Sequence, residues 1–168
     1  RLRKYLRKLD SDMQIIAKIE TPMALKYIDE IVQAADGVMV ARGDLAIEAG
    51  AEVVPIMQRK ITGLTRKYRK FVIIATQMLA SMVDNPQPSR AEVSDVATAA
   101  ITGVDCVMLS DETNNGKYPV QAVKTMKRIL AYTEEHMPVK AVYAEEAEVA
   151  GRAPLSGAAV SLAHTLGA

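Results

Sequence analysis

The sequence predicts an α/β fold with a parallel sheet, because short apolar runs alternate with amphipathic runs along most of its 168 residues. The apolar runs are rich in β-branched and sulfur-containing side chains, as is typical of buried parallel strands. We expect four strands, at residues 13–19, 37–41, 71–75 and 106–109. The helices expected after them span residues 22–34, 53–68, 91–101 and about 120–136.

The starts of two expected helices carry capping signals. Thr21 precedes Pro22, which is the arrangement of an N-cap followed by proline in the first helical position. Ser89 precedes Glu92 by three residues, the spacing of a capping box. The helix at 53–68 repeats apolar side chains every three or four residues. Residues 1–8 carry five positive charges on an amphipathic pattern, which predicts a further helix with a solvated face.

Polar side chains follow each of the four expected strands. In an open sheet the functional groups gather at one switch point, whereas a closed barrel draws them from the ends of several strands. The pattern therefore favours a (β/α)₈ barrel of the TIM-barrel type, of which four β/α units, about half, are present. The polar groups are Lys18 and Glu20, Arg42 and Asp44, Thr76 and Gln77, and Ser110 and Glu112.

The chain changes character after residue 138. We expect residues 1–138 to form the half barrel and the Ala/Glu-rich stretch 139–155 to be a linker. Residues 156–168 then begin a further domain, with its first helix at about 156–166.

Composition narrows the class of protein. A net charge of +1 supplies no overall field for nucleic acid or a membrane surface, and no apolar stretch approaches the ~20 residues of a membrane span. The single cysteine, Cys106, lies in an apolar run and is expected to be a buried small hydrophobe. A reducing, cytoplasmic setting fits best.

Two carboxylates and a lysine are expected to meet at the carboxyl edge of the sheet. Lys18 and Glu20 are two residues apart on an extended segment and point the same way, while Asp44 follows the neighbouring strand. Neighbouring strands lie about 4.8 Å apart, so Glu20 and Asp44 can share a hard divalent cation such as Mg²⁺. Each acid alone would more often be a helix cap or a surface ion-pair partner.

Five motifs in order and spacing resemble those of pyruvate kinases. They are residues 16–20 (IAKIE), 38–44 (VMVARGD), 75–79 (ATQML), 90–97 (RAEVSDVA) and 107–113 (VMLSDET). The resemblance covers nearly the whole chain, up to residues 156–160 (SGAAV), which are similar to the first helix of that family's C-terminal regulatory domain.

The resemblance implies that the chain supplies the last four strands of a barrel that transfers phosphoryl from phosphoenolpyruvate to ADP, giving pyruvate and ATP. It further implies Mg²⁺ or Mn²⁺ as cofactor, a K⁺ site outside this chain, and assembly into a homo-oligomer, normally a tetramer. By position, Lys18 and Thr76 match catalytic groups and Glu20 and Asp44 match the metal ligands. The substrate-binding positions are matched by Lys18, Arg42, Gly43, Asp44 and Thr76.

Some residues depart from the family pattern. Asp111 and Ala46 stand where glycine is usual, and Asn114 and Asn115 replace a small, alanine-rich turn. Arg42 is left open between a structural ion pair and a direct substrate contact, and Ser110 and Glu112 are expected to be mostly structural. Two alternatives to a pyruvate kinase are a metal-dependent barrel lyase acting on an enolpyruvate, and a non-catalytic copy that serves as an interaction module.

Overall fold

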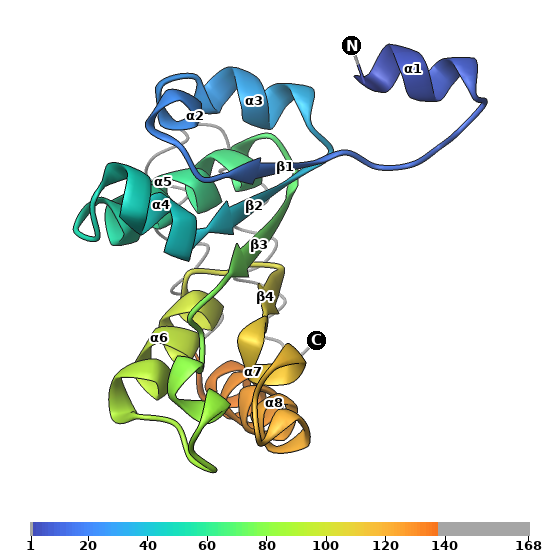
Figure 1. The fold of residues 1–168 in the computed structure, drawn as a ribbon. Helices are drawn as coiled ribbons and strands as arrows, with labels where there is room; N and C mark the ends of the chain where they lie inside the picture. The colour runs from blue at the N-terminus through green and yellow to red at the C-terminus, as the bar shows by residue number, and fades with distance from the viewer. Residues whose placement is uncertain (1, 138–168) are drawn as a thin grey trace, which may run out of the picture.

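The computed structural model describes residues 2–137, in which four parallel strands form one sheet in the order β1-β2-β3-β4 (Figure 1). The strands are β1 (Ile16–Ile19), β2 (Gly37–Ala41), β3 (Phe71–Ala75) and β4 (Cys106–Met108). The strand order follows the chain order, as in a barrel. The expected parallel α/β fold is confirmed. The expected linker and C-terminal helix lie outside the described residues.

Helices separate the strands along the chain. In order they are α1 (Leu2–Lys8), α2 (Pro22–Lys26), α3 (Ile28–Ala34), α4 (Arg42–Ala49), α5 (Val53–Lys67), the 3₁₀ turn η1 (Ala80–Val83), α6 (Arg90–Ile101), α7 (Asp111–Asn114) and α8 (Pro119–His136). The expected helix starts are present: Thr21 accepts a hydrogen bond from the amide of Ala24, and both bonds of the Ser89–Glu92 capping box form.

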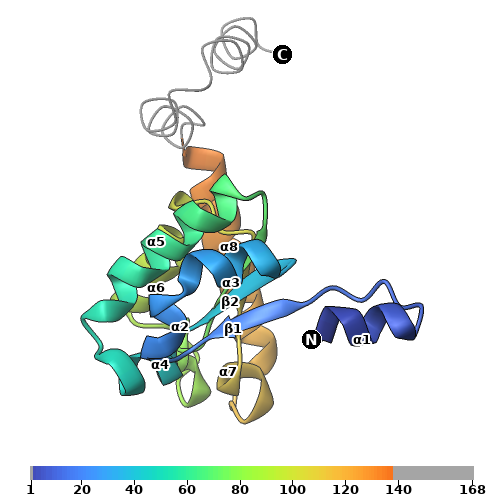
Figure 2. The same cartoon turned by 90° about the horizontal axis from the view of Figure 1, so that it is seen from above.

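The core lies between one face of the sheet and helices α2–α6 and α8 (Figure 2). Side chains alternate across a strand, and those that face the helices are fully buried, such as Val38, Val40 and Ile74. The opposite face is more open, because Ile16 and Phe71 keep 37% and 44% of their surface exposed. The exposure of apolar side chains is greatest at the amino end of that face, whereas Ala41 and Ala75 at its carboxyl end are fully buried.

Two expected elements differ in detail. Residues 13–15 form no part of β1, which begins at Ile16. The helix expected at 22–34 is interrupted at Tyr27, which ends α2 and begins α3 with φ −110° and ψ 26°. The interruption reorients the chain so that Ile28 and Val32 of α3 both reach the core.

Helix α4 begins at Arg42, directly at the end of β2, and ends at Gly50, whose φ is 101°. No helix was expected between residues 41 and 53 from the sequence. The sequence of α4 gives little helical signal, because Leu45 is its one buried apolar side chain and Ile47 is 83% exposed. Gly43 and Asp44 therefore lie within the first turn of a helix.

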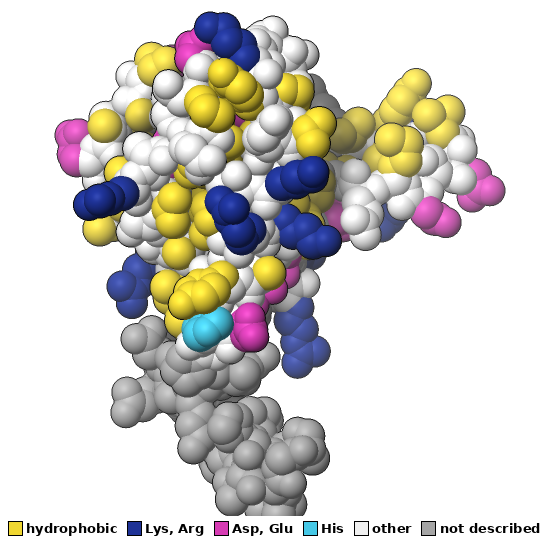
Figure 3. All heavy atoms as spheres, turned by 90° about the horizontal axis from the view of Figure 1, so that it is seen from below, with side chains coloured by type: hydrophobic (Ala, Val, Ile, Leu, Met, Phe, Trp, Pro, Cys, Tyr) yellow, Lys and Arg dark blue, Asp and Glu magenta, His cyan; other side chains and the backbone are white. Residues whose placement is uncertain are grey.

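Helix α1 stands apart from the body of the sheet at the end of an extended segment (Figure 1), and none of its residues is buried. Its link to the body is Arg3, whose guanidinium donates to the Ala34 carbonyl and pairs with Asp36, each at 3.0 Å. Apolar side chains lie on this projecting arm (Figure 3), among them the exposed Leu9 and Met13. No helix within residues 2–137 is long and apolar enough to cross a membrane.

Candidate functional site

Lys18, Glu20 and Asp44 meet at the carboxyl edge of the sheet, as expected from their positions after β1 and β2. The Lys18 ammonium lies 3.0 Å from Asp44 Oδ2 and forms a second, closer contact with Glu20 Oε2. All three side chains remain accessible, with exposed fractions of 50%, 37% and 52% for Lys18, Glu20 and Asp44. Two carboxylates therefore converge on one accessible cationic nitrogen.

The close contacts shift the protonation equilibria of this cluster. Hydrogen bonding to Glu20, and then to Asp44, raises the pKa of Lys18 above its ordinary value. The hydrogen bond from Lys18 lowers the pKa of the Asp44 carboxyl. Both shifts favour the charged forms of Lys18 and Asp44.

The donor set of Glu20 and Asp44 fits a hard divalent cation. Mg²⁺ is commonly held by one or two carboxylates and completes its shell with water or substrate oxygens. The Lys18 ammonium already shows that a cation is accommodated between these two carboxylates. Residues 2–137 contain no group of three or more His, Cys, Asp or Glu side chains that could hold a metal ion. Within these residues, Glu20 and Asp44 are the carboxylates placed to hold the cation.

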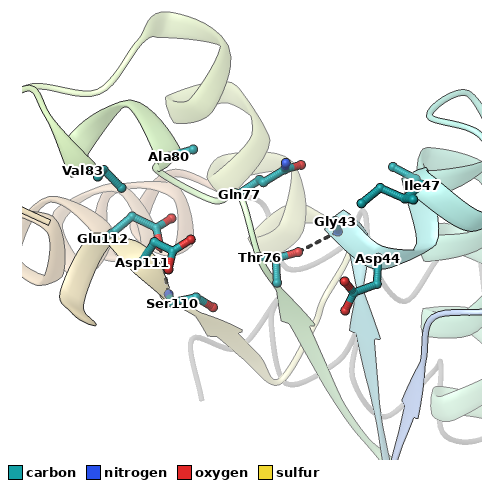
Figure 4. Close-up of a pocket in the computed structure, with 11 residues that line it drawn as sticks. Gly43, Asp44, Ile47, Thr76, Gln77, Ala80, Val83, Ser110, Asp111 and Glu112 are labelled. Carbon is teal, nitrogen blue, oxygen red and sulfur yellow. Dashed lines mark hydrogen bonds between the residues drawn. The ribbon is translucent and has the colours of Figure 1, made fainter. Parts of the chain in front are cut away.

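Gly43 and Thr76 join the ends of β2 and β3. The amide of Gly43 donates to the Thr76 hydroxyl at 2.7 Å (Figure 4). A Cβ placed on Gly43 would lie 3.3 Å from Thr76 Oγ1, tighter than an ordinary contact, which gives glycine a steric reason to stand there. The amides of the first helical turn lack intrahelical acceptors and carry partial positive charge. The start of α4 therefore presents N–H groups beside the accessible cluster.

Arg42 is buried, with only 8% of its surface exposed. Its guanidinium pairs with Asp95 of α6 at 2.6 Å and donates to the carbonyls of Thr76, at 3.0 Å, and Gln77, at 3.1 Å. These contacts support the structural alternative for Arg42, and its direct contact with substrate stays a prediction.

A pocket of about 420 Å³ opens beside Gly43 and Asp44. Thr76 and Gln77 border its middle, and the loop after β4, with Ser110 and Asp111, closes the opposite side (Figure 4). Lys18 and Glu20 are not among its lining residues. The cation cluster and the pocket therefore meet at Asp44, which belongs to both.

Comparison with known proteins identifies the family of this chain. The profile described as "Pyruvate kinase, barrel domain" matches residues 1–123. The chain belongs to the pyruvate kinase family. Its fold is accordingly part of the pyruvate kinase TIM barrel, as the five motifs had indicated.

Pyruvate kinases from distant organisms are similar to this chain. The enzyme named pyruvate kinase from Thermococcus litoralis is 50% identical over 136 residues, which is 81% of this chain and 29% of that protein. Pyruvate kinase from Geobacillus stearothermophilus is 48% identical over 153 residues, 91% of this chain and 26% of that protein. Plastidial pyruvate kinase 3 of Arabidopsis thaliana is 45% identical over 139 residues, 83% of this chain and 24% of that protein.

The chain therefore spans between about a quarter and three tenths of the length of these pyruvate kinases. The pyruvate kinase family uses a divalent metal, which agrees with the chemistry of Glu20 and Asp44.

Two features of the site were missed from the sequence, and the partners of a third residue, Glu112, were not foreseen. Asp95 lies inside the motif at 90–97, but its pairing with Arg42 is a long-range contact that no local pattern signals. The carbonyl of Gln77 is an acceptor for Arg42, and backbone roles leave no trace in side-chain type. Glu112 was expected to be mostly structural. It is 2% exposed and accepts the amides of Leu79 and Ser110, so it ties the loops after β3 and β4 together.

Proposed function

We propose that this chain carries the divalent-cation and enolate half of a pyruvate kinase active site, which transfers phosphoryl from phosphoenolpyruvate to ADP to give pyruvate and ATP. The observation that carries the proposal is the convergence of Glu20 and Asp44 on one cationic nitrogen at the mouth of the sheet. The matches to pyruvate kinases across most of the chain support it.

Glu20 and Asp44 would hold Mg²⁺ or Mn²⁺. Bound there, the cation would neutralise charge on the oxygens of the substrate. Phosphoryl transfer depends mainly on positioning and charge stabilisation. Lys18, attached to the adjoining strand end, supplies a second positive charge toward the phosphoryl oxygens. Losing one such interaction typically costs about 10²–10³ in rate.

Substrate would be oriented at the start of α4. The amide of Asp44 lies in the first turn, where N–H groups favour anions such as a carboxylate. The amide of Gly43 is already bonded to Thr76. Thr76 would present its hydroxyl to the enolate and help to protonate it through water, since an alcohol alone is too weak an acid at neutral pH.

Further expectations concern the whole protein. We expect the 168 residues alone not to turn over, since they correspond to under a third of the pyruvate kinases they match. We also propose a homo-oligomer, a tetramer by analogy, with dependence on K⁺ bound outside this chain, and a cytoplasmic location. The name of the Arabidopsis relative says chloroplastic, so location varies among the matched proteins.

Calorimetric titration tests the cation site without requiring turnover. Mn²⁺ with oxalate, an enolpyruvate mimic, is titrated into the 168-residue chain and into the double variant Glu20→Gln, Asp44→Asn. We expect binding to the unaltered chain and at least a hundredfold weaker binding to the double variant, because both anionic ligands are lost while their shapes are kept.

The matched control is Asp84→Asn, which removes a carboxylate paired with Lys117 at 2.8 Å on an exposed surface. Its binding should equal that of the unaltered chain. A folded unaltered chain that binds no Mn²⁺–oxalate would contradict the proposal and favour the non-catalytic interaction module. Retro-aldol cleavage by the chain would favour the lyase.

A further inference from the structure

Thr76 is attached at two points by consecutive residues of α4. The guanidinium of Arg42 donates to the Thr76 carbonyl, from Nη2 at 3.0 Å and from Nε at 3.3 Å. The amide of the next residue, Gly43, donates to the Thr76 hydroxyl oxygen at 2.7 Å. Both the backbone and the side chain of Thr76 are therefore placed by the first turn of one helix.

The backbone that receives these bonds is in an unusual conformation. Thr76 and Gln77 have φ values of 72° and 54°, in the left-handed region that non-glycine residues rarely adopt, least of all a β-branched residue. Such conformations persist when the surroundings hold them in place. The carbonyls of both residues are bonded to Arg42, so this side chain is the group that holds the left-handed pair.

Arg42 is itself anchored from the other side of the site. Asp95 on α6 accepts a hydrogen bond from Arg42 Nη1, which lies 2.8 Å from Asp95 Oδ1 and 2.6 Å from Asp95 Oδ2. The Arg42 side chain is 9% exposed, so loss of Asp95 would leave a buried charge without its counter-ion. Asp95 does not line the pocket, and its side chain is 35% exposed.

The double attachment fixes the direction of the Thr76 hydroxyl. Its oxygen accepts the Gly43 amide, so the hydroxyl proton is directed away from Gly43, and Thr76 borders the pocket. The Thr76 oxygen is thereby held in place, and its proton is left available for a hydrogen bond to a molecule in the pocket.

We propose that the Arg42–Asp95 pair is a positioning device that locks the left-handed Thr76–Gln77 backbone, so that the Gly43 amide orients the Thr76 hydroxyl toward the pocket. Its catalytic meaning rests on the proposed function, whereas its geometry does not. Arg42 and Asp95 are positioning residues here, because they act through Thr76.

Amide hydrogen exchange followed by NMR on the 168-residue chain measures the Gly43–Thr76 bond directly. In Asp95→Asn we expect the Gly43 amide to exchange at least tenfold faster relative to the amides of β2 and β3. Arg42→Lys, which keeps the charge but loses the fork of donors, should do the same. The control Ser89→Ala weakens the start of the same helix, α6, without altering the contacts of Arg42. It should not increase the exchange rate of the Gly43 amide relative to the amides of β2 and β3.

Mn²⁺–oxalate titration of the same variants separates the two proposals. Selective loss of Gly43 protection together with weaker oxalate binding supports the positioning device and its role in the site. Selective loss of protection in a chain that binds no oxalate even when unaltered supports the device and counts against the proposed function. Unchanged relative exchange of Gly43 in both Asp95→Asn and Arg42→Lys overturns the device.

Discussion

The two edges of the sheet use carboxylates in opposite ways. At the amino edge, Asp36 and Asp105 each accept a backbone amide from the strand segment beside them, from Ile15 and Val72, both at 2.8 Å. At the carboxyl edge, Glu20 and Asp44 instead share the Lys18 ammonium, on a side chain that can rotate away. A carboxylate satisfied by fixed backbone donors is committed to the fold, while one satisfied by a mobile ammonium stays available to a ligand.

Glu112 shows that the role of a carboxylate depends more on its hydrogen-bond partner than on the edge of the sheet at which it lies. It lies at the carboxyl edge close to the pocket, yet both of its oxygens accept backbone amides and only 2% of it is exposed. By the same criterion it belongs with the structural carboxylates.

Removal of the Glu112 carboxylate should cost the most stability. Glu112→Ala leaves the buried Leu79 amide and the partly buried Ser110 amide without acceptors, and a buried unsatisfied donor costs about 1–3 kcal/mol. We expect the free energy of unfolding to fall by roughly 3 kcal/mol in urea titrations followed by circular dichroism. The neighbouring and exposed Asp111→Ala should change it by no more than about 0.5 kcal/mol. Equal effects of the two substitutions would remove Glu112 from the structural class.

Removal of one carboxylate from each edge should separate stability from binding. Asp105→Ala leaves the Val72 amide without its acceptor, so we expect a loss of about 1 kcal/mol in stability and unchanged affinity for Mn²⁺–oxalate. Asp44→Asn should do the reverse, with unchanged stability and weaker binding. Urea titration and calorimetry on the two variants measure both quantities. A loss of binding in Asp105→Ala would break the division between the edges.

Asp36, at the amino edge of the sheet, should also make the free energy of unfolding depend on pH. The Ile15 amide, and then Arg3, lower the pKa of Asp36 below the ordinary aspartate value, which is about 3.9. Because the folded pKa is the lower one, this stabilisation is present above pH ~4 and is lost as pH falls through the folded pKa. Urea midpoints of the unaltered chain should therefore exceed those of Asp36→Asn at pH 7, and the difference should vanish in stronger acid. A difference that persists there would show that the charge of Asp36 is not its cause.

Local patterns in the sequence were sufficient for most elements. The bounds of β2 and β3 agree with the apolar runs, and the Ser89–Glu92 spacing correctly predicted a capping box. These features depend on residues close in the chain, through side-chain alternation and short-range hydrogen bonds. Helix α4 was missed because its apolar side chains do not repeat on one buried face, so its periodicity is weak.

In the candidate site, too, some features could be predicted from local patterns and others could not. Lys18, Glu20 and Asp44 could be brought together from the sequence, because parallel strands end at a common edge and the spacing of two residues keeps side chains on one side. The motifs likewise identified the family. The roles assigned to Arg42, Gly43 and Thr76 in binding substrate stay predictions.

The alternation of strands and helices could be predicted from the sequence alone, as could the family and the charges at the carboxyl edge, since each of these follows from local periodicity or from motif order. Which of those charges remain accessible to a ligand depends on long-range packing. Arg42 and Glu112 resemble Lys18 and Glu20 in sequence placement, but burial against Asp95 and against the amides of Leu79 and Ser110 commits them to the protein. Two of these contacts, Arg42–Asp95 and Glu112–Leu79, join residues more than 30 positions apart in the chain, which local sequence patterns do not record.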